Sequence, residues 1–287
     1  MQAPDAGLRH LFRSARYVEM AERLAPVYAG ASPFPHVVID DFLPEALASR
    51  MLAEFPSPDA ANWVRLDKSA YSKKLAANQE EQVGPFIFSV LQELNSADFL
   101  SFLQRLTGIQ GLAPDPYFEG GGLHQILPGG FLKVHADFNL HSVMRLDRRL
   151  NLLVYLNRDW RDDYGGHLEL WDRTMTRCET RVLPVFNRAV LFNTTDWSFH
   201  GHPDPLACPT GMTRKSIALY YYSRGRPEEE TSPSHSTLWQ IRPAEPGGSR
   251  LAWARRLRRV ARILDRVPKA LRRRADSLDG LPPGQGD

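Results

Sequence analysis

The sequence has few cysteines and no long apolar run, and both absences narrow the class of protein. Only two of the 287 residues are cysteines, Cys178 and Cys208, which excludes a disulfide-framed secreted scaffold and a four-cysteine zinc module. No run of about 18 apolar residues occurs, so no transmembrane segment is expected. The first eleven residues lack the apolar core of a secretory signal. We therefore expect a cytoplasmic protein, and a hydrophobic content of 43% indicates a globular one.

The net charge of +3 conceals a basic segment near the C-terminus. Between Arg250 and Asp276 there are eleven Lys or Arg residues against two Asp, a net charge of +9 that leaves −6 for the remainder. Apolar residues recur at helical spacing over 251–271, so residues 249–279 are predicted to form a basic amphipathic helix or tail. Three interpretations remain open: docking on the protein itself, contact with an anionic membrane surface, or contact with a polyanion or acidic partner.

Residues 1–115 are predicted to be mainly helical, with one strand. Apolar periodicity indicates helices over 8–24, from Pro44 to about Phe55, over 83–94 and over 97–107, and a strand over 37–39. Ser96 is a plausible N-cap for the last helix, and Gly108 a plausible stop. Residues 59–80 are polar and weakly patterned, which predicts a loop.

Residues 116–242 change to a β pattern. Short alternating or apolar runs separated by Gly and Pro predict strands over 131–137, 150–156, 167–171, 179–183, 188–193, 214–222 and 236–241. Many short strands of this kind indicate a sandwich or jelly roll. The predicted fold is therefore mainly β with flanking helices, and Pro243 to Gly248 is predicted to be a linker.

Two segments contain side chains suited to binding a metal. In Phe131–Asp137, alternation along a strand places His135 and Asp137 on the same face. They supply two of the three ligands of a 2-His-1-carboxylate site, which leaves open positions on Fe(II). The segment from Trp197 offers His200 or His202 as the third ligand; both share a face, so alternation does not choose between them.

Arg214 begins a strongly β-patterned stretch that runs to Tyr222. Alternation puts Arg214 and Ser216 on one face of this strand, and Lys215 and Ile217 on the other. A guanidinium at the entrance to a buried strand requires an anionic partner, typically a carboxylate.

The order of these residues resembles the Fe(II)/2-oxoglutarate-dependent dioxygenases, and within them the prolyl 4-hydroxylase-like branch. The resemblance is carried by the His-x-Asp pair, a distal His about 60 residues later, and an Arg before a Ser-Ile-Ala-Leu-Tyr-Tyr strand. It extends over residues 34–225 through three further stretches, namely Leu150–Asn157, Gly165–Leu170 and Phe186–Asn193. It implies a double-stranded β-helix (jelly roll) core within 116–242.

The resemblance also implies roles for individual residues. His135, Asp137 and His200 would bind iron, with His200 preferred over His202 because the distal histidine follows the hairpin after the Phe-rich strand. Arg214 would pair with the far carboxylate of 2-oxoglutarate, and Tyr155 would help to hold that carboxylate. The cofactors implied are Fe(II), 2-oxoglutarate and O2, with ascorbate as an optional reductant.

Two departures from the pattern concern the cosubstrate pocket. Gln125 falls where a tyrosine often lines the pocket in this branch, and residues 203–213 lengthen the segment between His200 and Arg214. The additional residues are expected to form a lip near the substrate.

Several other polar residues are predicted to have structural roles. His124, His141 and His167 are interpreted as surface or hydrogen-bonded core histidines, with an approach to the metal site as the alternative. The cluster Arg145, Arg148 and Arg149 is interpreted as a solvated loop, with a role toward substrate as the alternative. Asn139, just after the His-x-Asp pair, is a weaker candidate for orienting substrate.

The resemblance predicts an enzyme that hydroxylates an unactivated C–H bond. A prolyl residue of a protein is the first expected substrate, and a small metabolite or glycan is the second. A catalytically silent jelly-roll binding module is the alternative from another class, but the complete set of His135, Asp137, His200 and Arg214 argues against it.

Overall fold

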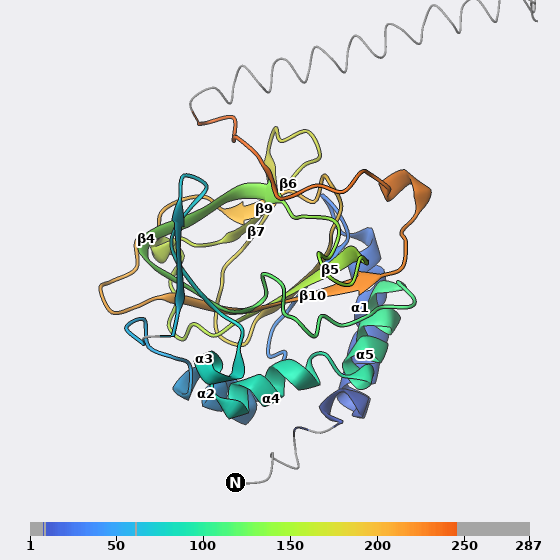
Figure 1. Cartoon of the computed structure of the whole chain (residues 1–287), viewed down its shortest axis with the longest axis horizontal. Helices are drawn as coiled ribbons and strands as arrows, with labels where there is room; N and C mark the ends of the chain where they lie inside the picture. The colour runs from blue at the N-terminus through green and yellow to red at the C-terminus, as the bar shows by residue number, and fades with distance from the viewer. Residues whose placement is uncertain (1–7, 9, 61, 246–287) are drawn as a thin grey trace, which may run out of the picture. The chain divides into compact units, whose positions relative to one another are not determined.

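The computed structural model describes residues 8, 10–60 and 62–245 (Figure 1). The chain divides into two compact units, of which the first covers residues up to Arg173 and from Arg177 to Gln240. The second contains, among the described residues, 174–176 and 241–245. The predicted basic helix over 249–279 lies outside the described residues, and within them no helix is long and apolar enough to cross a membrane.

The N-terminal part of the chain is mainly helical, as the apolar periodicity predicted. Five α-helices are formed: α1 (Ala15–Gly30), α2 (Glu45–Ala53), α3 (Glu80–Val83), α4 (Pro85–Glu93) and α5 (Ala97–Thr107). The caps predicted for α5 are confirmed. The Ser96 hydroxyl accepts a hydrogen bond from the Phe99 amide at 3.2 Å, and Gly108 ends the helix with a φ of 75°.

Eleven strands form a continuous antiparallel sheet in the described chain. Their bounds are β1 (His36–Ile39), β2 (Val64–Lys68), β3 (Tyr71–Ala77), β4 (Gly122–Ala136), β5 (Asp147–Tyr155), β6 (Leu168–Trp171), β7 (Cys178–Val182), β8 (Ala189–Asn193), β9 (His200–His202), β10 (Arg214–Ser223) and β11 (Leu238–Trp239). The order β1-β8-β5-β10-β4-β9-β6-β7 curls into the nearly closed barrel of a jelly roll, as predicted (Figure 1).

The long strand β4 joins the two halves of this barrel. Its first residues, 122–126, pair with β10, whereas Leu132 and His135 pair with β9 in the opposite layer. Between these two stretches lie Gly129 and Gly130, where a Cβ on Gly130 would lie 2.6–2.9 Å from neighbouring atoms. The absence of a side chain therefore lets the strand turn from one layer into the other.

Side chains alternate along β5 between two environments. Leu152 and Val154 pack in the core formed with the helices, while Leu153 and Tyr155 face the barrel interior beside Phe192 of β8. Helices α1, α4 and α5 lie on the outer side of the layer that contains β5 and β10 (Figure 1). The helices thus cover one face of this layer, and the other face is left to line the barrel.

The predicted loop over residues 59–80 is wrong in its main part. Residues 64–77 form the hairpin β2–β3, and β3 pairs with β4 along the barrel. The sequence did not reveal this hairpin because the alternation in β2 extends only from Val64 to Asp67, and β3 shows no clear alternation. Four of the five residues in β2 are exposed, so burial imposes almost no pattern on them.

Candidate active site

Strands β4 and β9 bring the predicted metal ligands together. His135 lies near the end of β4, Asp137 directly follows that strand, and His200 is the first residue of β9. His135 and His200 are paired in register. Between His200 and His202, a Cβ on Gly201 would lie 2.8 Å from the Lys133 carbonyl oxygen, so glycine permits the close approach of the two strands.

The three side chains converge on one point. The Nε2 atoms of His135 and His200 each lie 3.5 Å from an Asp137 carboxylate oxygen. The Nδ1 atoms lie 2.9 Å from the carbonyl oxygens of Lys133 and Ser198 respectively. Because a carbonyl only accepts, each Nδ1 carries the proton, and each Nε2 presents its lone pair toward Asp137. The donor set of the described residues thus fits a divalent metal.

Both His200 and Asp137 are held in the protonation states that metal binding requires. Burial, together with the nearby His135, lowers the pKa of His200 to about 4, so its imidazole is neutral near pH 7. Burial opposes ionisation of Asp137. The positive charge of Arg148 and the neighbouring imidazoles outweigh that effect and hold the pKa of this carboxyl well below its ordinary value.

A buried arginine and an asparagine on β5 orient the Asp137 carboxylate. Oδ2 of Asp137 accepts a hydrogen bond from Asn151 Nδ2 at 2.7 Å and lies 3.0 Å from Arg148 Nη2. Arg148 also donates two hydrogen bonds to Asn151 Oδ1, and its guanidinium lies between the rings of Phe138 and Tyr220. Both of these contacts with Asp137 are made by Oδ2. The other oxygen, Oδ1, lies on the side of His135 Nε2.

The prediction of a solvated arginine cluster is therefore wrong for two of its three members. Arg148 is 1% exposed and Arg149 is 8% exposed, whereas Arg145 lies on the surface. Both buried arginines belong to β5. Arg148 pairs with Asn151 on the same strand and with Asp137, eleven residues earlier, whereas Arg149 donates to the distant Ser223. The polar run that contains the arginines gives no indication of these contacts.

Replacing Arg148 with methionine should weaken metal binding without removing a ligand. The Asp137 carboxylate would lose its charged partner and its fixed orientation, so we expect Fe(II) affinity to fall by about 10–100-fold. An anaerobic Fe(II) titration of the variant measures this. Arg145→Met removes a similar charge from the surface and should leave the affinity unchanged; an equal loss in both variants would contradict the assignment.

Arg214 lies at the other end of the same cavity. It is 4% exposed, and no carboxylate in the described part of the chain lies within ion-pair distance of it. Its Nε donates to the Gly166 carbonyl at 2.8 Å, and its Nη2 lies 3.2 Å from the Tyr155 hydroxyl. A Cβ on Gly166 would lie 3.0 Å from Arg214 Cδ, so glycine makes room for the arginine. A buried, unpaired guanidinium is a site for an anionic ligand.

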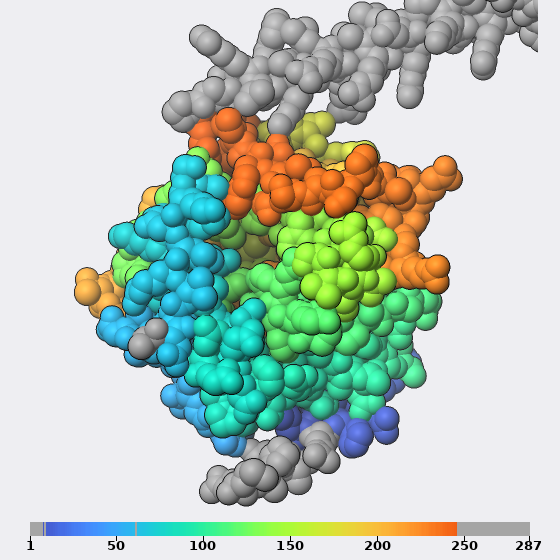
Figure 2. Space-filling view, viewed as in Figure 1, coloured from blue at the N-terminus to red at the C-terminus, as the bar shows by residue number. Residues whose placement is uncertain are grey.

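The triad and Arg214 line one cavity of about 230 Å³. Figure 2 shows the molecular surface hollowed beside the β2–β3 hairpin. The predicted face of β10 is confirmed, because Arg214 and Ser216 line the cavity and Ile217 belongs to the core with the helices. The cavity is further lined by Leu66, Tyr71, Lys74, His124, Ile126, Leu132, Phe138, Arg148, Asn151, Leu153, Leu168, His202, Tyr220, Thr237 and Trp239.

The structure shows where the two departures from the family pattern, Gln125 and residues 203–213, lie relative to the cavity. Gln125 points away from the cavity and donates to the Thr213 hydroxyl at 2.7 Å; its neighbour His124 occupies the inward position. The expectation of a lip over 203–213 is wrong, because none of these residues lines the cavity. Instead, Leu206 pairs through its backbone with Gly129 and Gly130 at the bend of β4.

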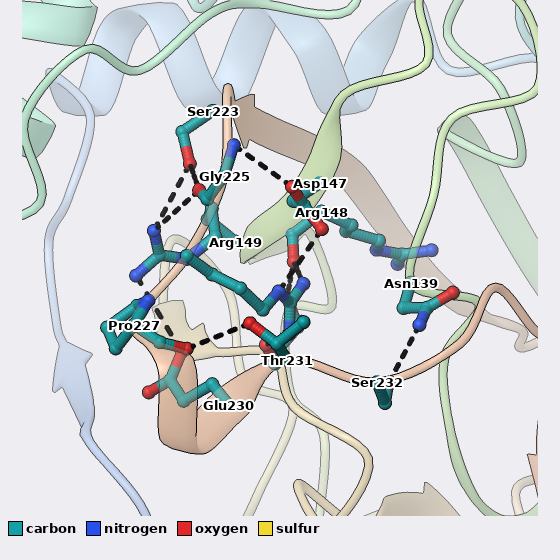
Figure 3. Close-up of polar contacts among 12 residues, drawn as sticks. Asn139, Asp147, Arg148, Arg149, Ser223, Gly225, Pro227, Glu230, Thr231 and Ser232 are labelled. Atoms are coloured by element: carbon teal, nitrogen blue, oxygen red, sulfur yellow. Dashed lines mark hydrogen bonds and ion pairs between the residues drawn. The ribbon is translucent and has the colours of Figure 1, made fainter.

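Asn139 does not line the cavity, and its side chain instead holds the segment that leads to β11. Its Nδ2 donates to Ser232 Oγ at 3.0 Å (Figure 3). The same Nδ2 donates to the Pro233 carbonyl at 2.9 Å, and Oδ1 accepts from the His235 amide at 3.0 Å. β11 then pairs with β4, and the Trp239 ring lies 5.0 Å from the His135 ring. Asn139 thus fixes one wall of the cavity mouth.

Of the four other histidines considered from the sequence, two have structural partners and two line the cavity. His141 is fully buried against Asp115, and His167 pairs with Asp162, as their structural interpretation predicted. His124 and His202 both line the cavity, so for His124 the alternative of an approach to the site holds and the favoured structural interpretation is wrong. Burial first, and nearby cations second, keep the pKa of both groups well below its ordinary value, so both are neutral.

Comparisons with known proteins agree with this geometry. Residues 121–222 match the model of the 2OG-Fe(II) oxygenase superfamily. No curated protein sequence gives a significant match. Among solved structures, a prolyl hydroxylase from Trichoplax adhaerens, in complex with a peptide fragment of the hypoxia inducible factor oxygen degradation domain, is 19% identical. The alignment covers 73% of this chain and 94% of that one, with a TM-score of 0.53. A Pseudomonas putida prolyl-4-hydroxylase is 20% identical over 70% and 100% of the chains, with a TM-score of 0.50.

The chain matches the 2OG-Fe(II) oxygenase superfamily over residues 121–222, and its fold is the one found in prolyl hydroxylases. It is thus a 2-oxoglutarate-dependent oxygenase, with Fe(II) and 2-oxoglutarate as its cofactors. When bound, the metal and 2-oxoglutarate would supply the electrons that reduce O2, with 2-oxoglutarate oxidised to succinate and CO2. The chain's own side chains fit both: His135, Asp137 and His200 would hold the metal, and Arg214 with Tyr155 would hold the far carboxylate.

Proposed function

We propose that this oxygenase hydroxylates an unactivated C–H bond of a prolyl residue in a protein. The proposal rests on one observation: a single cavity contains both a three-ligand metal site and a buried arginine, Arg214, that has no carboxylate partner among the described residues. Three protein ligands leave positions for cosubstrate and O2, and a cavity open at one end admits a substrate beside them. The complete set argues against a silent binding module.

The mouth of the cavity supports a prolyl substrate. Tyr71 of β3 and Trp239 of β11 face each other there with ring centroids 6.0 Å apart, and Trp239 is 40% exposed. Flat, partly exposed rings provide packing surfaces for a saturated five-membered ring at little entropic cost. The shared fold with two prolyl hydroxylases is compatible with this substrate class.

Mass spectrometry of peptide products tests the proposal. The full-length protein is incubated with Fe(II), 2-oxoglutarate and O2 together with a panel of proline-containing peptides and the same peptides with alanine in place of proline. We expect a mass gain of one oxygen atom, on proline only, with succinate formed in equal amount. If succinate forms but only a small metabolite or a glycan gains oxygen, the class of enzyme stands and the prolyl substrate is refuted.

A further inference from the structure

Lys74 is a cavity-lining cation that the metal site and Arg214 leave unexplained. It belongs to β3, where it pairs in register with Ile126 of β4, and Ile126 pairs on its other side with Arg214 of β10. All three residues line the cavity. Adjacent strands lie about 4.8 Å apart, so Lys74 and Arg214 begin about 10 Å from one another in one row of the sheet. Both side chains extend into the cavity from opposite sides of Ile126.

The ammonium of Lys74 has no partner in the part of the chain that the structure describes. It makes neither a hydrogen bond nor an ion pair there, although every other cation lining the cavity does. Arg148 is paired with Asp137, and Arg214 is fixed by Gly166 and Tyr155. Lys74 is half-buried, and a half-buried ammonium without an acceptor is unfavourable. An anion in the cavity would supply the missing partner.

The surrounding charges favour an anion from outside the chain. Burial lowers the pKa of Lys74 to about 8; Asp137 opposes this, while Arg214 and Arg148 add to it. The neighbouring imidazoles of His124 and His202 are neutral and supply no counter-charge. Asp137 is already engaged by Arg148 and Asn151. The ammonium therefore lies within a locally positive part of the cavity, on the row that ends at Arg214.

We propose that Lys74 and Arg214 together form a two-cation site for the far carboxylate of 2-oxoglutarate. A carboxylate has two oxygens and about four acceptor positions, so it can accept from a guanidinium on one side and an ammonium on the other. The β2–β3 hairpin would then take part in selecting a dicarboxylate cosubstrate. The inference rests on 2-oxoglutarate being the cosubstrate of the proposed function.

Calorimetry on the Fe(II)-loaded full-length protein, without oxygen, tests this with two ligands. The first is 2-oxoglutarate, and the second is 2-oxopentanoate, which has the same carbon chain but no far carboxylate. Lys74→Met should raise the Kd of 2-oxoglutarate by about tenfold or more, because one charge-assisted hydrogen bond is lost. The Kd of 2-oxopentanoate should stay within about twofold of wild type, because that ligand cannot use the ammonium.

Lys73→Met is the matched control. Lys73 is the adjacent residue on β3, is exposed, and donates to the Pro128 carbonyl instead of lining the cavity. This variant should bind both ligands as wild type does. Equal weakening of both ligands by Lys74→Met, or no weakening of either, would overturn the two-cation site. If wild type itself fails to bind 2-oxoglutarate, the cosubstrate assignment fails instead, and the two failures are thereby distinguished.

Discussion

Replacing His135 with alanine should abolish succinate formation. The variant retains only Asp137 and His200 of the convergent set, and neither can replace the lost Nε2 lone pair. Since loss of a partner that merely orients a ligand costs about 10–100-fold, loss of the ligand itself should lower activity and Fe(II) affinity by more than about 100-fold. Anaerobic metal titration and a succinate assay measure the two effects, and turnover by the variant at the wild-type rate would contradict the metal assignment.

The neighbouring histidines of β9 give this prediction its sharpest control. His200 and His202 lie on the same face of the strand and line the same cavity, yet only His200 lies within 3.5 Å of Asp137. We therefore expect His200→Ala to lose the metal and His202→Ala to bind one equivalent. The opposite result would show that the distal ligand is His202.

Replacing Arg214 with methionine should raise the Kd of 2-oxoglutarate by about 100-fold or more. The far carboxylate of the ligand would enter a buried cavity without its bidentate partner, and removing one member of a buried ion pair costs about 3–5 kcal/mol. Methionine retains much of the side-chain volume, so the wall beside Gly166 should not collapse. Anaerobic calorimetry with the Fe(II)-loaded variant provides the measurement.

Two further observations separate a lost ligand contact from a damaged fold. Fe(II) affinity of Arg214→Met should be unchanged, because none of the metal ligands contacts Arg214 in the described structure. Arg214→Lys should recover part of the 2-oxoglutarate affinity, since it restores the charge but not the fork of donors. A methionine variant that binds 2-oxoglutarate as tightly as wild type would refute the role of Arg214.

The parts of the site that follow from local patterns were predictable from the sequence. The alternation on β4 placed His135 and Asp137 on one face, and that on β10 placed Arg214 and Ser216 together. The choice between His200 and His202 did not follow from alternation, because both point the same way. It required the family resemblance, and the distances to Asp137 agree with that choice.

The residues that support the site could not be predicted in this way. Arg148 follows an irregular polar stretch, so its sequence context is that of a surface residue, although the folded strand β5 places it beside Asp137. Lys74 belongs to β3, which shows no clear hydrophobic period. Asn151 occupies an inward position in an apolar strand. A polar residue at such a position is the one local signal that could have identified it.

The central claim is that His135, Asp137, His200 and Arg214 form one 2-oxoglutarate-dependent iron site. The most direct test is to load the full-length protein with Fe(II) and 2-oxoglutarate without oxygen, admit oxygen, and quantify succinate in the absence of any added substrate. We expect slow uncoupled release of succinate by the wild type and none by Asp137→Ala. Release at the same rate by both proteins would contradict the claim, as would the absence of succinate from a wild type that demonstrably binds both cofactors.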